Sequence, residues 1–389
     1  MRIAINQLEE YNYLASRGAK QAARALSQMT GIKMRHEVTG VSLVSDEALA
    51  DIFTGQKYVG VQVGLSGGIA GETVLIFDPN SAGRLRKRLQ SRGGESTLAG
   101  GAFAELGNIM IGGFIDGWAD HLGTEVDMTP PTYIEAAGTR ILPPITRRDA
   151  EEYGVFLFES RLQAVNHDLS VPIYLIPEYS EFVKLLRAQP SGLAVPAEKL
   201  TVFNGFADQS ARRASQQISQ LTGLRTDVTV SQLRFISFSD ISSEVGTNEY
   251  VSVVFELTGR PSGYFVVMFS EDSASRVASA MLPGGVDPDN GGMMQEAIKE
   301  LGNIVTSGFI DGWANTLQSS IEHSPPEYIE DSGSNIIETV QRRLSDQQEY
   351  AFTIDTTITI DNRQAEVQLY VLPDTRELAE ALSALPVQE

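Results

Sequence analysis

Polar and hydrophobic positions recur with two different spacings along the chain, and each change of spacing predicts the start of a new element. The stretch "GAKQAARALSQMTG" has helical spacing and ends at Gly31, a residue type that commonly terminates helices. The stretches "YVGVQVGL" and "GETVLIFD" alternate as strands do, and the glycine-rich "SGGIAG" between them predicts a hairpin turn. A short helix, "SAGRLRKRL", is expected directly after the second strand.

The same order of elements then continues. A long helix that contains "ELGNI" is followed by the strands "GVFLFES" and "VPIYLIP" and by the closing helix "YSEFVKLLRA". A half made of one helix, three strands and one helix therefore occurs twice. We predict an α+β fold in which two such halves form a pseudo-two-fold pair, with a mainly antiparallel sheet backed by long helices.

This whole arrangement is itself repeated about 195 residues further along the chain. The aligned stretches are "LSQMTG" with "ISQLTG", "PPTYIE" with "PPEYIE", and "IYLIPEYSEFVKLLRA" with "LYVLPDTRELAEALSA". Small residues and proline in "AQPSGLAVPAEK" are typical of a linker. We therefore predict two homologous domains, residues 1–190 and 198–389, joined by a linker at 191–197.

Composition excludes several classes of protein. The chain has 389 residues, of which 42% are hydrophobic, and this is enough for two cores. No run approaches the roughly 18 apolar residues of a transmembrane helix, and the first residues lack the apolar segment of a signal peptide. With no cysteine there is no disulfide framework and no thiolate chemistry. We expect a soluble, cytoplasmic protein.

The charge narrows the choice of partner. The formal net charge is −20, from 50 acidic and 30 basic residues, which disfavours binding to nucleic acid or to an anionic membrane. Arginine outnumbers lysine by 23 to 7. This combination is typical of a high-salt cytoplasm, such as that of a halophilic archaeon, where screening makes the charge tolerable. An ordinary acidic protein from a GC-rich genome is an equally good explanation.

The most informative repeat is "ELGNIMIGGFIDGWADHLG", which recurs as "ELGNIVTSGFIDGWANTLQ". Residues three apart share one face of a helix, so Glu105 projects beside Asn108, and Glu300 beside Asn303. A proline follows each Asn at the same distance in both copies. One such pair is common on exposed helices, and duplication preserves spacing for structural reasons as well. The repetition therefore supports a functional pair without proving one.

Three glycines of the first copy, Gly112, Gly113 and Gly117, each lower helix propensity by roughly 1 kcal/mol. Their presence predicts close packing against this helix, or close approach by another chain.

The spacing Glu-x-x-Asn with a proline 23 residues after the Asn resembles the CheC family of chemotaxis phosphatases (the CheC/CheX/FliY superfamily). The resemblance covers both domains nearly end to end, including the "ELGNI" core and the "LIP" strand before the last helix. It implies two tandem CheC-like domains. Members of this family remove phosphate from the aspartate of the response regulator CheY.

The resemblance also assigns roles to residues. Asn108 and Asn303 would orient the attacking water, because an amide offers a donor and an acceptor without titrating. Glu105 and Glu300 would anchor the active-site lysine of the regulator. The chain would need no cofactor of its own, since the Mg²⁺ would sit on the regulator. The four histidines fit this, because none forms a spaced ligand pair; we expect them to be structural or on the surface (His36, His121, His167 and His323).

Some positions depart from the family pattern. The family often has Ser or Asp four residues before the Glu, and here these positions are Gly101 and Glu296. In the first half of each domain the Glu and Asn positions are occupied by other residues, so we predict that these two sites are inactive (Tyr13 and Ser16; Gly205 and Asp208). Glu9 and Asn12 could form a third site, although they lie one helical turn too early, and the second domain has Thr201 and Asn204 there.

Other functions fit less well. The chain has no P-loop, and "SGGIAG" lacks the lysine of a phosphate cradle; no G-x-S-x-G motif is present either. The main alternative is a non-catalytic adaptor that binds CheD, CheY or archaellar or flagellar switch proteins. A switch component of the FliY type is a weaker alternative, because such proteins carry an additional C-terminal domain and this sequence stops at its second closing helix.

Overall fold

The structure is a computed structural model, and its chain divides into two compact units. One unit comprises residues 3–192, and the other comprises residues 193–389 with residues 1–2. The ranges described here are 2–44, 49–50, 52–53, 55–91, 99–144, 155–165, 169–185, 194–196, 199, 210, 212–221, 223–229, 233–282, 292–344, 348–360 and 365–384. Of the expected linker, 191–197, only residues 194–196 are among them, as strand β9 (Ala194–Pro196).

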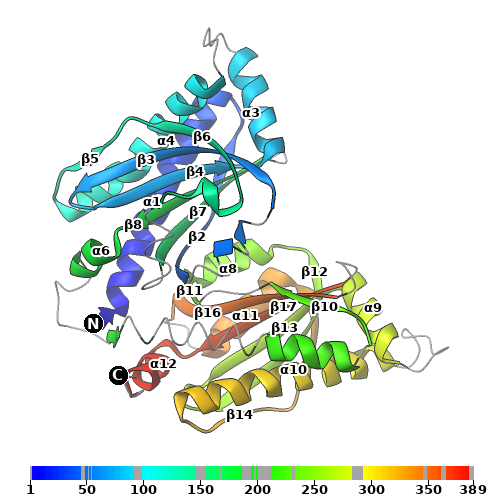
Figure 1. Ribbon diagram of the computed structural model, residues 1–389. Helices are drawn as coiled ribbons and strands as arrows, with labels where there is room; N and C mark the ends of the chain where they lie inside the picture. Colours follow the sequence, from blue (N-terminus) through cyan, green and yellow to red (C-terminus); the bar gives the residue numbers. More distant parts are fainter. Residues whose placement is uncertain are drawn as a thin grey trace. The chain divides into compact units, whose positions relative to one another are not determined.

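The first unit contains the expected succession of helices and strands (Figure 1). After β1 (Arg2–Ala4), its elements are α1 (Ile5–Thr30), β2 (Met34–Val44), β3 (Lys57–Gly67), β4 (Gly71–Phe77), α3 (Pro79–Ser91), α4 (Ala99–Leu122), β5 (Val126–Met128), β6 (Thr132–Ala137), the 3₁₀ helix η1 (Gly138–Ile141), β7 (Val155–Ala164), β8 (Ser170–Pro177) and α6 (Tyr179–Leu185).

The second unit repeats this succession with additions. A helix over residues 212–221 precedes β10 (Thr226–Thr229), β11 (Leu233–Ser237), α8 (Phe238–Val245), β12 (Glu249–Gly259), β13 (Gly263–Ser270), α9 (Glu271–Met281), α10 (Met293–Leu317), β14 (Ile321–His323), β15 (Glu327–Ser332), α11 (Gly333–Leu344), β16 (Tyr350–Ile360), β17 (Ala365–Pro373) and α12 (Thr375–Ala384).

The strand pairing of the first unit shows the pseudo-two-fold symmetry. The hairpins β3–β4 and β7–β8 meet through the antiparallel pair β4–β8 at the centre of the sheet. Each half adds its first strand to the hairpin of the other half, because β2 pairs with β7 and β6 pairs with β3. All of these pairs are antiparallel, which confirms the predicted fold class.

The second unit is built in the same way. Strands β13 and β17 form its central pair, β15 joins β12, and β10 and β11 join β16. The hairpin turns after β3 and β12 use glycines with positive φ, at Gly67 (94°) and Gly259 (112°). The prediction that "SGGIAG" is a hairpin turn is therefore confirmed, and "TGRPSG" forms the corresponding turn of the second unit.

Helix α1 shows why its end was predictable and its start was not. Gly31 has φ 71°, and its N–H donates to the Ser27 carbonyl at 2.9 Å, which ends the helix as expected. The helix begins at Ile5, well before the predicted stretch, because apolar residues continue its buried face toward the N-terminus. Leu8, Tyr11 and Leu14 are all buried on this face.

The sheet of the first unit is buried on both faces. In β4, Leu75 and Phe77 point to the same side as the long helices α1 and α4, and the Phe77 ring lies 5.3 Å from that of Phe103 on α4. Val74 and Ile76 point to the opposite side, into a cluster closed by η1 and by the residues around Phe53. The helices thus rest on a filled sheet that holds them in place.

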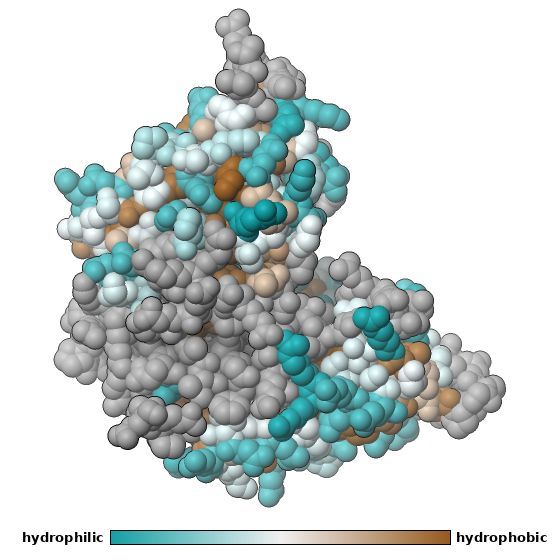
Figure 2. Space-filling model, in the orientation of Figure 1, coloured by the Kyte–Doolittle hydropathy of each residue, from teal (hydrophilic) through white to brown (hydrophobic). Residues whose placement is uncertain are grey.

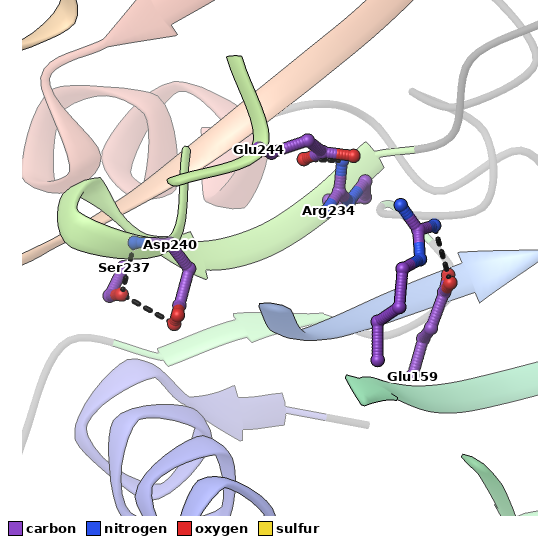
Figure 3. A network of polar contacts seen from close by, with 6 residues as sticks. Glu159, Arg234, Ser237, Asp240 and Glu244 are labelled. Atoms are coloured by element: carbon purple, nitrogen blue, oxygen red, sulfur yellow. Dashed lines mark hydrogen bonds and ion pairs between the residues drawn. The ribbon is translucent and has the colours of Figure 1, made fainter. Parts of the chain in front are cut away.

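The second unit contains two helices that the sequence analysis did not anticipate, α8 and α11, and they pack on each other and on strands of its own sheet. Ser237 caps α8: its Oγ accepts from the Asp240 N–H at 3.1 Å and donates to Asp240 Oδ2 at 2.6 Å (Figure 3). An ion pair of 3.0 Å between Arg234 and Glu244 joins β11 to the same helix (Figure 3). Helix α8 has only eight residues, three of them serines, so its helical spacing is weak. Helix α11 does have helical spacing, with Ile336, Ile337 and Val340 buried, and it was missed all the same.

The "ELGNI" helices lie very close to the sheet at one glycine in each unit. A Cβ added to Gly107 would collide with Val61 on β3, and one added to Gly302 would lie 3.2 Å from Val253 Cβ on β12. The adjacent Leu106 and Leu301 are fully buried. Leu and Gly of "ELGNI" therefore face the sheet, and this orientation turns the Glu and Asn away from it.

At Gly112, Gly113 and Gly117, close packing against the described residues is not found, whereas close approach by another chain stays a prediction. A Cβ at Gly117 would meet no atom within 4 Å, and Cβ atoms at Gly112 and Gly113 would make ordinary contacts of 3.7 Å. In α10 the counterparts of Gly113 and Gly117 are Gly308 and Gly312, and these do pack closely, against Gln217 and Ser210. The position that requires glycine in α4 is Gly107.

We predict that Gly107→Ala lowers the free energy of unfolding by about 1–3 kcal/mol, because the added methyl group displaces α4 from β3. Gly117→Ala is the matched control on the same helix. It should be neutral or stabilise by up to about 1 kcal/mol through helix propensity. Chemical denaturation of the full chain measures both. Equal effects of the two substitutions would contradict the close contact at Gly107.

Candidate functional site

Helix α4 presents the first Glu/Asn pair to solvent. Glu105 and Asn108 are both exposed, and Ile109 beside them is 41% exposed, which is unusual for isoleucine. Neither Glu105 nor Asn108 makes a hydrogen bond or ion pair to another described residue. Because their side chains are not engaged within the described chain, both are available to a binding partner.

Helix α10 presents the second pair in the same orientation. Glu300 is exposed, whereas Asn303 and Ile304 are half-buried. Neither side chain of the pair is hydrogen-bonded to another described residue. The structure therefore brings Glu105 together with Asn108, and Glu300 with Asn303, on equivalent outward surfaces of the two units.

A short strand after each helix returns alongside the pair. Strand β5 pairs with β3 so that Met128 lies opposite Leu65, and β14 pairs with β12 so that His323 lies opposite Leu257. The prolines 23 residues after each Asn, Pro131 and Pro326, follow these strands and are half-buried in both units. The proline thus ends the segment that borders the pair, which accounts for the constant spacing.

We define two surfaces by their equivalent residues. The first face comprises Glu105, Asn108, Ile109, Gly112 and Met128. The second face comprises Glu300, Asn303, Ile304, Ser307 and His323.

The second face contains a hydrogen-bonded pair that the sequence analysis missed. Ser307 Oγ lies 3.0 Å from His323 Nε2, and His323 Nδ1 lies 3.0 Å from the Ser324 carbonyl. The imidazole ring also packs edge-on against Phe255, with centroids 5.3 Å apart. The two residues are sixteen apart in sequence, so only the return of β14 beside α10 could have revealed their contact.

A tyrosine and a glutamate after the proline are also duplicated. The Tyr133 hydroxyl donates to Glu135, and the Tyr328 hydroxyl donates to Glu330 at 2.6 Å. Partial burial, together with the acceptor glutamate, raises the pKa of each tyrosine above its usual value. Tyr133 packs on Phe103 of α4, with centroids 5.9 Å apart. The contact between Tyr133 and Phe103 packs β6 against α4, the helix that carries the first face.

The two positions four residues before each Glu differ in kind. Gly101 is exposed and offers no side chain. Glu296 is also exposed, and its carboxylate pairs with Lys299 at 3.2 Å. The only carboxylate at this position is therefore engaged with a neighbour on its own helix.

The first half of the first unit lacks an equivalent pair. Tyr13 is 56% exposed and Ser16 is half-buried, so two non-equivalent residue types occupy the outward surface of α1. Asn12 is only 2% exposed, and its Oδ1 has no hydrogen-bond partner among the described residues. Since Asn12 faces the core, it does not form a solvent-facing pair with the exposed Glu9. Thr201, Asn204, Gly205 and Asp208 lie outside the described residues.

Among the described residues, no group of three or more potential metal ligands is found. Of the four histidines, His36 on β2 and His323 are half-buried. His167 and the side chain of His121 lie outside the described part of the chain.

In the view of Figure 2, hydrophilic residues cover much of the described surface. No helix in the described ranges is long and apolar enough to cross a membrane.

Comparison with protein families gives two matches. Residues 251–357 match the family described as "Chemotaxis phosphatase CheX". Residues 102–135, which include the first Glu/Asn pair, match the family described as "CheC-like family".

Comparison with solved structures gives matches to FliY of Thermotoga maritima and to CheX of Desulfovibrio desulfuricans. The FliY structure has a TM-score of 0.38 and 18% identity, with coverage of 47% of this chain and 95% of that chain. The CheX structure has a TM-score of 0.31 and 15% identity, with coverage of 43% and 99%, respectively.

Curated relatives align with about half of the chain. The CheY-P phosphatase CheC of Bacillus subtilis is 22% identical over 191 residues, which are 46% of this chain and 90% of that protein. CheC1 of the halophile Halobacterium salinarum is 32% identical over 194 residues, which are 49% of this chain and 98% of that protein. With nearly the whole length of such a relative matched, this chain belongs to the CheC family of chemotaxis proteins.

Proposed function

We propose that this chain dephosphorylates the aspartyl-phosphate of a CheY-type response regulator, and that each unit contributes one active face. The observation that carries the proposal is a Glu/Asn pair, present in both units on a helix held tightly to the sheet, whose side chains make no hydrogen bond or ion pair to another described residue. Glu105, Asn108 and Glu300 are exposed, and Asn303 is half-buried. Family membership supports the reaction, because a relative of this chain is named as a CheY-P phosphatase.

The proposed reaction needs positioning more than covalent chemistry. Hydrolysis of an acyl phosphate requires a water molecule in line with the bond that breaks. Asn108 or Asn303 would hold this water: the amide oxygen would accept a hydrogen bond from it, and the amide nitrogen would donate one to its oxygen or to the phosphoryl group. An amide keeps this geometry at any physiological pH, because it does not titrate.

Glu105 and Glu300 would anchor the regulator. Residues three apart on a helix have Cβ atoms about 5–6 Å apart on one face, so the carboxylate could engage a lysine while the amide engages the phosphoryl group. The Mg²⁺ of the reaction would be held by the regulator. For this reason we expect the chain to need no cofactor of its own.

Binding to the face also excludes bulk water from the reacting group. The Glu and Asn protrude from a helix whose opposite side is fixed by Gly107 or Gly302 against the sheet. Such a support preorganises the amide, so that little conformational freedom is lost when the regulator docks. The contact of Gly107 or Gly302 with the sheet should therefore affect the rate of dephosphorylation.

We predict that Asn108→Ala and Asn303→Ala each reduce the rate of dephosphorylation only in part, and that the double variant reduces it about 100-fold or more. The decay of phosphorylated regulator, measured in high salt with each variant, tests this. Asn315→Ala is a matched control, because Asn315 is exposed on the same helix, α10, but away from the pair. This control should retain the wild-type rate.

The adaptor function remains the second candidate, and it is favoured by the replacement of the pair on α1 by Tyr13 and Ser16 while the fold is kept. An adaptor would bind CheY, CheD or switch proteins without hydrolysis. If the wild-type chain leaves the decay of the phosphorylated regulator unchanged, both alone and with CheD, the phosphatase proposal is wrong and the adaptor function replaces it.

We predict two active faces in this chain rather than three. Asn12→Leu replaces a buried amide, whose Oδ1 lacks a partner among the described residues, with an apolar group of similar volume. The free energy of unfolding should rise by about 1–2 kcal/mol, with no change in the dephosphorylation rate. Loss of activity in a folded Asn12→Leu variant would instead reveal a third site at Glu9 and Asn12.

A further inference from the structure

The two faces differ at two positions that border the Glu/Asn pair. Ser307 lies four residues after Asn303, one helical turn along the same face, and Gly112 lies at the same distance after Asn108. Met128 and His323 are equivalent, because each lies opposite a leucine of the neighbouring strand in the same register. A Gly/Met combination in one unit thus replaces a Ser/His combination in the other.

The first face is apolar beyond its Glu and Asn. Ile109 is 41% exposed and Met128 is 38% exposed. A Cβ added to Gly112 would lie 3.7 Å from the Met128 methyl group, so the glycine leaves the thioether side chain uncovered on its helix side. Exposed isoleucine and methionine at a docking surface favour contact with an apolar side chain of the partner, and methionine adapts readily to its shape.

The second face is polar at the same place, and its hydrogen-bond direction can be deduced. A backbone carbonyl can only accept, so the ring nitrogen next to the Ser324 carbonyl, Nδ1, must carry a hydrogen. In the neutral ring, Nε2 is then an acceptor, and the Ser307 hydroxyl donates to it. The remaining lone pairs of Ser307 Oγ can therefore accept a hydrogen bond.

The Ser307 hydroxyl is also held in a fixed position. His323 is fixed by its carbonyl contact and by its edge-on contact with Phe255 at 5.3 Å. A preorganised acceptor loses little freedom when it binds a donor, and it is costly to leave without one when an apolar group covers it. The second face therefore discriminates against partners that place an apolar side chain at this point.

We propose that Ser307 and His323 on one face, and Gly112 and Met128 on the other, are specificity-determining residues. The second face accepts a regulator surface with a hydrogen-bond donor beside its phosphorylation site, and the first face accepts an apolar side chain there. This inference rests on the proposed function, and it makes the two faces non-equivalent toward any one regulator.

The test measures each face separately. The Asn108→Ala protein retains the second face, and the Asn303→Ala protein retains the first. With one phosphorylated regulator as substrate, the KM values of these two proteins should differ by about tenfold, the size expected for one hydrogen bond made or lost at an interface. Equal KM values for the two proteins would overturn the inference.

Exchange of the residues supplies the decisive step. In the Asn108→Ala protein, Ser307→Gly with His323→Met should move KM toward the value of the first face. In the Asn303→Ala protein, Gly112→Ser with Met128→His should move KM the opposite way. Both exchanges should change kcat less than twofold, because they alter docking and not the amide. KM values that stay with the helix instead of following the exchanged residues would also overturn the inference.

A milder variant guards against loss of folding. Ser307→Thr keeps the hydroxyl and should keep the KM of the second face. Ser307→Ala removes the hydroxyl and should change KM in the same direction as the exchange of Ser307→Gly with His323→Met. Thermal unfolding identifies variants that do not fold. If both the Ser307→Thr and the Ser307→Ala protein fold and have the same KM, the hydroxyl determines nothing and the inference is wrong.

Binding measurements separate this inference from the proposed function. The dissociation constant of the regulator, activated with beryllofluoride and Mg²⁺, is measured for the same variants. If no variant hydrolyses the phosphorylated regulator but the dissociation constants follow the exchanged residues, the phosphatase proposal fails and this inference stands. If hydrolysis depends on Asn108 and Asn303 but neither KM nor the dissociation constant follows the exchange, this inference alone fails.

Discussion

The proposed active faces depend on the contact between one glycine of each long helix and one valine of the sheet, because this contact sets how closely the helix lies on the sheet. Gly107 lies against Val61, and Gly302 lies against Val253. A Cβ at Gly107 would collide with Val61, so a larger residue there would displace the helix and disturb the packing of the buried Leu106. At Gly302 the contact is tight but less severe, 3.2 Å from an added Cβ to Val253. Because this side of the helix faces the sheet, the Glu and Asn lie on its outward side in both units.

Two levels of duplication place this contact. Within the first unit, each half lends a strand to the hairpin of the other, so neither half buries its sheet alone. The tandem repeat then copies the whole unit. Duplication explains why the pair recurs, but not why it is lost from α1, where Tyr13 and Ser16 occupy the outward positions. Helix α1 packs on the sheet without a Glu/Asn pair at these positions, so a long helix of this fold can form without one.

Much of this organisation could be predicted from the sequence, because it rests on local patterns. The helix end at Gly31 and the hairpin turn at "SGGIAG" follow from residues adjacent in the chain. The contact at Gly107 could not be predicted, because it joins a helix to a strand distant in sequence. The Ser307–His323 pair could not be predicted either, because it depends on how β14 turns back beside α10. The burial of Asn12 could not be predicted from the sequence either, since it depends on which side of α1 faces the core. The functional roles of Glu105, Asn108, Glu300 and Asn303 stay predictions.

The most direct test of the central claim is a crystal structure of the full chain bound to a beryllofluoride-activated regulator with Mg²⁺. We expect the amide of Asn108 or Asn303 within about 3.2 Å of the position of the in-line water. Glu105 or Glu300 should lie within ion-pair distance of the regulator's active-site lysine. A regulator that docks elsewhere on the chain, or one whose beryllofluoride group lies beyond the reach of both amides, would contradict the account.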